Sequence, residues 1–438
     1  MRLSRSLVLA VSAMPAFAQY AGPAILSRGE APASMSTLQI DFRPFVDISG
    51  IYTTGLSGVA TGPQGTLGNI ASAGLQVAFG VSGMHSWKHT QVGLDYVGSL
   101  AHYTTTTYYG GYNQSLLFSV THQLSRHAVF SLRENASITS QGLGFPGLPQ
   151  TVPFDPASTY NPTTDFYDNR TTSLSTAASF TLQKSTRLSF SLGGQDNLTY
   201  RRSTVLYSLG SYGANGDVQY RLTRRSTVGA NYAYTHFAYH GTFNATDIHS
   251  VSGTYAIQLS RSLEFTGFGG FSRVESKFLQ NVPIDPVIAA LIGVTNGVVI
   301  SHSIVLHPIY SARLSRSFQR GVAFLSGGSS VTPGNGLFLT STALTASAGY
   351  TYTGLRRWSL GATAAYIHAN SISNVIGAYG NVSGILSTSR QIGRFTHLTF
   401  SFSAIQYQSS SFVGYNRLTY SANLGLGFAP GNIPLRIW

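Results

Sequence analysis

Histidine has the widest catalytic range of the side chains in this sequence, and seven histidines stand in or beside stretches of alternating apolar and polar residues. They are His102, His236, His240, His249, His302, His307 and His368. Hydrolysis by a serine nucleophile would need one of them grouped with a serine and an acidic residue. No stretch groups these three residue types toward a single end. A triad is defined by geometry and not by order, so spatial convergence stays open. We expect these histidines to be interfacial or hydrogen-bonded structure.

Other site chemistry is not indicated by the spacing of the residues. No metal-ligand spacing, phosphate loop or nucleotide fingerprint rises above chance. The chain has no cysteine, which rules out a disulfide scaffold and thiolate metal sites. We therefore expect no cofactor, no metal and no enzyme activity.

A recurring polar turn between two alternating stretches organises the chain. Its clearest copy lies in residues 217–237, DVQYRLTRRSTVGANYAYTHF. Val218, Tyr220 and Leu222 alternate with polar residues before the turn, and Val228 and Tyr232 alternate with small or polar residues after it. Period two on both sides of a tight turn predicts a β-hairpin with one apolar face.

Further copies of this basic turn recur along the chain, most of them at steps of about 38 residues. They lie at 84–92, 124–129, 182–190, 259–265, 314–322, 352–358 and 389–395. Eight turns predict nine hairpins, and hence eighteen strands, with sixteen as the alternative. A β-propeller has a similar repeat length, but each of its blades needs four short strands, whereas each repeat here holds two long ones.

The composition is that of a chain without a water-facing surface. Charged residues make up 9% and hydrophobic residues 43% of 438 positions, far fewer charges than the roughly one quarter usual in soluble domains. The net charge of +13 is spread two or three residues at a time over the turns, which argues against nucleic acid binding. Anionic lipid headgroups or simple solvation of the turns account for these basic residues.

The two ends of the chain carry their own signals. Residues 1–18 have basic Arg2 and Arg5, an apolar run and a small-residue motif before Gln19, which predicts a secretory signal peptide. Residues 19–43 read as a flexible lead-in, 44–428 as the barrel and 429–438 as a tail. The strand ending at Phe428 resembles the C-terminal signal read by barrel assembly machinery, and either Phe428 or Trp438 could be its terminal aromatic residue.

Two long connections interrupt the repeat. Residues 141–170 are rich in proline, which prevents strand pairing, and residues 276–301 contain a short segment in which Asp285 could cap a helix starting at Pro286. We expect this helix to rest on the outer rim, with narrowing or plugging of the lumen as the alternative. One strand position breaks the alternation: Glu134 has outward parity, which predicts a bulge, a protein contact or a place near the interface.

Strands of about ten residues predict a transmembrane antiparallel up-and-down β-barrel, with its short basic turns in the periplasm and its longer loops outside the cell. The bulky residues would face lipid and the small polar residues the lumen. The chain resembles the outer-membrane β-barrel porins of Gram-negative bacteria, including those associated with exopolysaccharide systems, through turns such as Tyr220–Arg225. The resemblance implies an outer-membrane channel and carries over no functional residue.

Parity predicts which charged residues line the lumen. These are Asp47, Asp95, Arg133, Asp217, Arg221, Arg313 and Arg417. The sequence favours passive diffusion of small hydrophilic solutes, with secretion of an exopolysaccharide, and a plugged structural barrel or barrel enzyme, as alternatives. Outer-membrane lipid, the assembly machinery and the transported solute or polysaccharide are the expected partners, and an oligomer is compatible with the sequence.

Overall fold

The computed structural model of the chain describes residues 39–54, 71–104, 111–139, 170–202, 207–333, 340–352, 354–355, 357–372, 378–409, 416–430 and 433–436. Several expectations lie outside these residues: the signal peptide, 1–18, most of the lead-in, 19–43, almost all of the proline-rich loop, 141–170, and Trp438 as the terminal aromatic residue.

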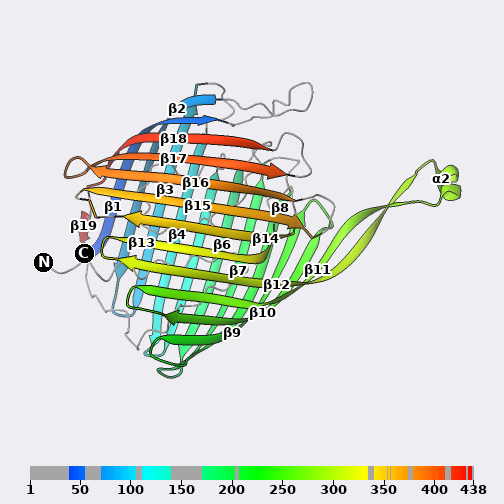
Figure 1. The fold of residues 1–438 in the computed structure, drawn as a ribbon, viewed down its shortest axis with the longest axis horizontal. Helices are drawn as coiled ribbons and strands as arrows, with labels where there is room; N and C mark the ends of the chain where they lie inside the picture. The colour runs from blue at the N-terminus through cyan, green and yellow to red at the C-terminus, as the bar shows by residue number, and fades with distance from the viewer. Residues whose placement is uncertain are drawn as a thin grey trace.

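The described chain forms one closed antiparallel barrel of eighteen strands (Figure 1). The strands are β1 (Gln39–Thr54), β2 (Ala71–Ser86), β3 (Thr90–Tyr103), β4 (Gly111–Ser125), β5 (Ala128–Thr139), β6 (Thr171–Gln183), β7 (Leu188–Arg201), β8 (Ser208–Arg221), β9 (Ser226–His240), β10 (Ala245–Gln258), β11 (Leu263–Pro283), β12 (Asn296–Phe318), β13 (Gly321–Thr332), β14 (Ser341–Tyr352), β15 (Trp358–Ser371), β16 (Tyr379–Gln391), β17 (Thr396–Ser409) and β18 (Arg417–Phe428). Each strand pairs with its neighbours in sequence, and β1 pairs with β18 from Val46↔Phe428 to Thr53↔Ser421. The predicted count of eighteen is therefore confirmed, in preference to sixteen.

The two faces of the wall have opposite hydropathy, as the alternation predicts. On β1, Val46, Ile48 and Tyr52 are exposed on the outside, whereas Asp47 and Ser49 are buried on the inside. This arrangement suits a wall with lipid outside and a polar interior, and closure leaves the backbone of the wall paired within the sheet.

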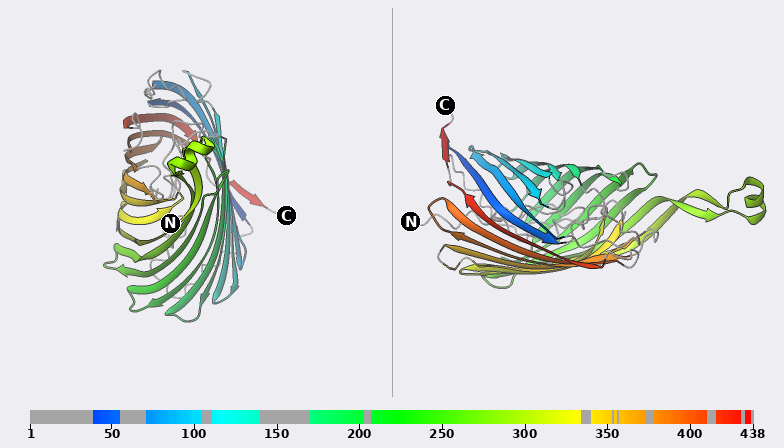
Figure 2. Two further views of the ribbon diagram at one scale, coloured as in Figure 1. Left: turned by 90° about the vertical axis from the view of Figure 1, so that its right-hand side faces the viewer. Right: turned by 90° about the horizontal axis from the view of Figure 1, so that it is seen from above.

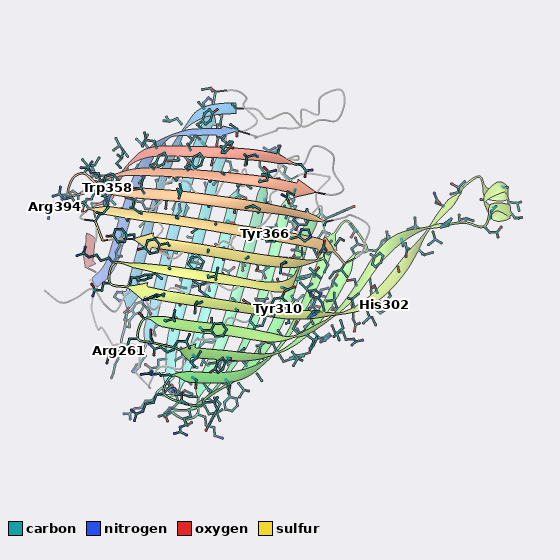
Figure 3. All side chains as sticks on the ribbon, in the orientation of Figure 1. Arg261, His302, Tyr310, Trp358, Tyr366 and Arg394 are labelled. Carbon is teal, nitrogen blue, oxygen red and sulfur yellow. The ribbon has the colours of Figure 1, made fainter. Side chains whose placement is uncertain are left out.

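The basic turns gather at one end of the barrel, which we call the turn end; the opposite end is the long-loop end. Arg261, Trp358 and Arg394 mark the turn end in Figure 3. There the guanidinium of Arg390 lies 5.1 Å from the centre of the Trp358 ring, and that of Arg394 lies 5.0 Å from the Phe395 ring. Arginine stacked on aromatic rings suits a membrane–water boundary.

For residues 276–301 the expected helix and its Asp285 cap are confirmed, but the expectations of an unpaired loop and of a helix on the rim are wrong. β11 and β12 stay paired as far as Pro283↔Asn296, and their hairpin projects from the long-loop end, away from the barrel (Figures 1 and 2). The predicted helix exists as α2 (Pro286–Ile292), capped by the Asp285 carboxylate at 2.8 Å from the Val287 nitrogen and ended by left-handed Gly293. It stands at the tip of the hairpin, so it neither rests on the rim nor plugs the lumen. Among the described helices none is long and apolar enough to cross a membrane.

The wall splits between β12 and β13 near the long-loop end. Their pairing stops at Tyr310↔Ser329, although β12 begins at Asn296. The next hydrogen-bonded pair on that edge would need an N–H group at Pro308. Proline has none, so the ladder ends here. Beyond this point β13 and β14 fold inward while β11 and β12 continue outward.

The first strand begins earlier than expected and meets the chain's last strand. β1 starts at Gln39, ahead of the expected residue 44, and Gln39–Phe42 pairs with β19 (Ile433–Arg436). The last strand thus extends the β1–β18 seam at the turn end.

Candidate functional site

The barrel interior is the candidate site, and the seven predicted lining residues all have the parity opposite to that of the exposed bulky residues on their strands. Asp47, Asp217, Arg221 and Arg417 are buried, while Asp95, Arg133 and Arg313 are partly exposed. They do not converge on one point. They lie on six different strands, which suits a charged lining.

Asp47 is held at the seam of the barrel. The Thr399 hydroxyl donates to its Oδ2 at 3.2 Å. A side chain at Gly425 would put its Cβ 2.8 Å from Asp47 Oδ1, so glycine is needed there to make room for the carboxylate. The seam therefore carries a fixed inward acid.

Opposite charges lie near each other on the inner face in two places. Asp217 and Arg221 lie on the same face of β8, and the Ser191 hydroxyl donates to Asp217 at 3.4 Å. Asp95 on β3 and Arg133 on β5 attract each other across β4. The interior consequently has interspersed charges of both signs.

Sequence reasoning missed further charged residues with inward parity, among them Glu264 and Arg201. Glu264 shares the inward parity of Thr266 on β11 and attracts Arg313, whose guanidinium also lies 4.7 Å from the centre of the Phe324 ring. Arg201 ends β7 with the parity of buried Asn197. Both could have been found by extending the alternation to the strand ends.

At the long-loop end, the inner face of β9–β11 contacts the end of β13 and the start of β14. Val331 is buried against Phe237, Ile248 and Val274, and Leu209 and Ile372 pack on this cluster. Val331 has the parity of an outward residue. It is nevertheless buried, because the split in the wall allows the end of β13 to pack against the inner face of β9–β11.

A chain of hydroxyl groups ties the same contact together. The Tyr239 hydroxyl donates to the Pro333 carbonyl at 2.9 Å and lies 2.9 Å from Thr340 Oγ1. Thr246 Oγ1 lies 2.8 Å from Thr340 Oγ1 and 3.2 Å from Ser276 Oγ. Each hydroxyl has one proton, so with Tyr239 donating to Pro333 the protons must point in one direction along Ser276, Thr246, Thr340 and Tyr239. We call the apolar cluster and this chain the mouth contact.

Inward tyrosines surround the same end of the barrel. Tyr103 ends β3, Tyr239 lies near the end of β9, and Tyr379 and Tyr407 stand on the paired strands β16 and β17. All four are buried. Their ring faces are packed against the protein and are not presented to the lumen.

The structure brings together some of the histidines that looked scattered. On the outer face, His236 Nδ1 lies 2.8 Å from Asp247 Oδ1, and Tyr234 donates to the same oxygen at 2.7 Å. His249 Nδ1 lies 2.9 Å from the Tyr232 hydroxyl. The register of β9 against β10 makes these neighbours, since His236 is opposite Asp247 and Tyr234 is opposite His249. Sequence spacing alone does not reveal such a pair.

One histidine meets a serine at the split in the wall. His307 Nε2 lies 3.1 Å from Ser329 Oγ. A serine–histidine pair needs an acidic residue to orient the imidazole before it resembles a hydrolytic triad. Among the described residues no acidic side chain is recorded as bonded to His307, so the contact reads as a structural hydrogen bond across the split.

Glu134 is satisfied without a bulge. β5 pairs with β6 in unbroken register at this position, and Thr176 donates to Glu134 Oε2 at 2.7 Å. Of the three expectations for this residue, the protein contact is therefore the one observed, and the parity shift is wrong.

Comparisons with known proteins give structural matches only. No known protein family matches the sequence, and no curated protein matches it. Among solved structures, the chain is similar to Pseudomonas aeruginosa OccK2 (OpdF) at 11% identity and a TM-score of 0.44, covering 91% of this chain and 99% of that one. Acinetobacter baumannii OccAB1 matches at 12% identity and a TM-score of 0.42, covering 94% and 100%. OccK2 in complex with glucuronate matches at 11% identity and a TM-score of 0.43, covering 90% and 98%.

Proposed function

We propose that the protein is an outer-membrane channel for passive diffusion of small hydrophilic solutes. The observation that carries this proposal is the closed eighteen-stranded wall with bulky apolar residues outside and Ser, Thr, Asn, Gln and mixed charges inside. Barrels of this strand number enclose an aqueous passage unless loops fill it. Spanning by such a wall, together with the predicted signal peptide, supports location in the outer membrane.

The lining charges support passive movement rather than chemistry. We propose that Asp47, Asp95, Arg133, Asp217, Arg221, Arg313 and Arg417 line the passage, where their parity directs them inward from six strands. Mixed signs without a converging cluster suit weakly selective passage. On the same ground we propose that the chain is not an enzyme and needs no cofactor.

Secretion of a polysaccharide would call for aromatic faces open to the passage, on which sugar rings could slide. The inward tyrosines at the long-loop end are buried, and the loop 141–170, the other source of such rings, lies outside the described residues. No described feature favours this second function.

Planar-bilayer recording of the purified, folded protein tests the proposal. We expect stepwise conductance with little preference between cations and anions, and a larger conductance when residues 145–165 are deleted if that loop narrows the lumen. Folding is checked independently by different gel migration of heated and unheated samples, since folded barrels resist unfolding in cold detergent. Folded protein without conductance, with or without this loop, would identify a plugged or structural barrel instead.

A further inference from the structure

An open cavity with basic walls lies at the turn end of β2–β5, and we call it the turn cavity. Its volume is about 390 Å³, and it is lined by His89, His122, Gln123, Leu124, Ser125 and Arg126. His89 belongs to the turn between β2 and β3, and the other lining residues belong to the end of β4 and the turn into β5. None of these residues belongs to the charged lumen lining described above.

The strand register directs the turn cavity's central histidine to the outer wall. His122 stands opposite Thr90 on β3 and opposite Phe130 on β5. His122 has the parity of exposed Leu116, and Thr90 has the parity of exposed Leu94. His122 therefore faces the membrane boundary and not the lumen.

The end of β4 is irregular at the turn cavity. Gln123 pairs with Val129, but the next pair is Ser125 with Ala128, so Leu124 is the extra residue of a β-bulge. Each of the other described pairings between neighbouring barrel strands keeps one register throughout. A bulge bends its strand and redirects side chains, and bulges are frequent beside functional sites. This bulge brings Leu124 into the lining of the cavity.

Hydrogen bonds fix both walls of the turn cavity. The Gln123 nitrogen donates to the His89 carbonyl at 2.7 Å, which ties the β2–β3 turn to the end of β4. The Thr90 hydroxyl lies 2.7 Å from His122 Nδ1. With Thr90 donating, the imidazole carries its proton on Nε2, which can then donate to a ligand.

The β4–β5 turn adds two further donors. The Ser125 hydroxyl accepts from the His127 nitrogen at 3.2 Å, so its own proton can be donated elsewhere. The Arg126 guanidinium carries a permanent charge and has donors but no acceptor. The cavity therefore suits a ligand that offers several oxygen acceptors and a negative charge.

The charges of the neighbouring turns narrow the choice of ligand. Residues 84–92, 122–130 and 182–190 span three successive turns, and each contains Lys or Arg but no Asp or Glu. Phosphate oxygens match arginine and imidazole donors. A headgroup amine would find no carboxylate in these turns. A phosphate group without an accompanying amine is consequently the better match.

Apolar neighbours favour a lipid over a free phosphate ion. Leu124 is 57% exposed in the cavity lining, and Trp87 in the β2–β3 turn is 50% exposed. Tryptophan is enriched at the boundary between a membrane and water. Acyl chains can contact these two side chains, whereas a free ion would use only the polar part of the site.

We propose that the turn cavity binds the phosphate group of a phospholipid with net negative charge, in the membrane leaflet at the turn end. Arg126 and the imidazoles of His89 and His122 donate to the phosphate oxygens. The acyl chains leave the cavity along Leu124 and Trp87. The site lies on the outer wall, so it is independent of transport through the lumen.

Native mass spectrometry of the folded, delipidated protein tests the site. The wild type should retain phosphatidylglycerol in preference to phosphatidylethanolamine. Arg126→Gln and His122→Phe should each weaken this retention about tenfold or more, as expected for loss of a hydrogen bond to a charged group. Arg261→Gln removes the same charge from the exposed β10–β11 turn and is the matched control, which should retain the lipid.

Three results of this titration would overturn the proposal. Equal weakening in Arg126→Gln and Arg261→Gln would show a general effect of turn charge. Equal retention of the two lipids by the wild type would remove the selectivity. Displacement of phosphatidylglycerol by an equal concentration of inorganic phosphate would assign the cavity to the free ion.

Tryptophan fluorescence in vesicles tests where the lipid lies. Trp358→Phe with Trp438→Phe leaves Trp87 as the only tryptophan. Phosphatidylglycerol with brominated acyl chains should quench Trp87 more than brominated phosphatidylcholine at the same mole fraction, and Arg126→Gln should remove this difference. Equal quenching by the two lipids without Arg126→Gln would contradict the site.

Conductance separates this proposal from the proposed function. Channel conductance and gel migration should be the same in the wild type, Arg126→Gln, His122→Phe and Arg261→Gln. Loss of lipid selectivity with normal conductance would count against the lipid site alone. Selective lipid binding by a folded barrel without conductance would count against the proposed channel alone.

Discussion

The hydroxyl of Tyr239 on β9 donates a 2.9 Å hydrogen bond to the carbonyl of Pro333, 94 positions later in the chain and just beyond the end of β13. This bond joins one wall of the barrel to a segment folded in from another. This hydrogen bond and the burial of Val331 together hold the mouth contact in place.

Replacing Tyr239 with phenylalanine keeps the ring in the apolar cluster but removes the hydroxyl. The Pro333 carbonyl and the Thr340 hydroxyl then lose a buried partner, which costs about 1–3 kcal/mol. We expect the docked end of β13–β14 to loosen, with larger or noisier single-channel conductance. Tyr255→Phe is the control, because Tyr255 lies exposed on the outer face of β10. Identical conductance traces for Tyr239→Phe and wild type would separate the hydroxyl chain from control of the passage.

Replacing Val331 with aspartate puts a charge into the cluster of Phe237, Ile248 and Val274. Burial of an unpaired carboxylate is far less favourable than burial of valine, by several kcal/mol. The end of β13–β14 should therefore leave the inner face, and mean conductance should rise more than in Tyr239→Phe. Val294→Asp is the control: Val294 is exposed between α2 and β12, so the conductance of this variant should match that of the wild type. A barrel that folds normally and conducts as before would contradict a narrowing role for this contact.

The mixed lining charges predict weak ion selectivity that single substitutions can shift in either direction. Removing Arg221 by Arg221→Gln should move the reversal potential in a salt gradient toward cation preference, and Asp217→Asn should move it toward anions. The two residues share one face of β8, so the double variant should return close to the wild type. Shifts of the same sign in both single variants would show that these groups do not face the ion path.

Cysteines placed beside the two ends of β9 should differ in their reaction with a thiol reagent in intact cells. A barrel that starts and ends in the periplasm has its short turns there, so a cysteine at exposed Arg225 should escape a membrane-impermeant thiol reagent in intact cells. A cysteine at Phe243, 72% exposed in the β9–β10 connection, should react. Lysed cells, in which both sites should react, provide the control for reagent access. The reverse pattern in intact cells would invert the orientation.

Thr176→Val should destabilise the barrel although it preserves side-chain size. Glu134 would lose its 2.7 Å donor on the outer face, and a carboxylate without a partner beside lipid is unfavourable by roughly 1–3 kcal/mol. A lower urea midpoint for refolded protein in lipid would show this effect. Thr172→Val, on the same strand and face but opposite Ile138 and Tyr200, should change the midpoint much less.

Much of this fold could be predicted from the sequence, because every barrel strand alternates apolar and polar residues. Alternation set the faces of β1 and β18, and the recurring turns gave the strand number. Asp285 followed by Pro286 signalled the helix start. These features depend on residues close together in the chain.

The parts that could not be predicted depend on contacts between distant strands. Val331 follows the outward parity of β13, and only the split of the wall explains why it is buried. Pro308 was a readable sign that β12 has an open edge there, but nothing local indicates where β13 goes instead. The contact of His236 with Asp247 likewise follows from the register of two strands rather than from spacing.

The seam between β1 and β18 has a consequence for biogenesis. Asn423 Nδ2 donates to Ser49 Oγ at 3.2 Å across 374 positions of sequence, whereas the other barrel strands pair with their immediate neighbours. Closing a loop of this length is the entropically slowest step of folding. Until the last strand pairs with β1, the unfinished sheet has two open edges that can pair with other chains. A chain shortened before Arg417 would lose the pairings of β18 with β1 and β17 and that of β19 with β1, and would keep the others. Two edges would then stay open, so quality-control proteases should remove it.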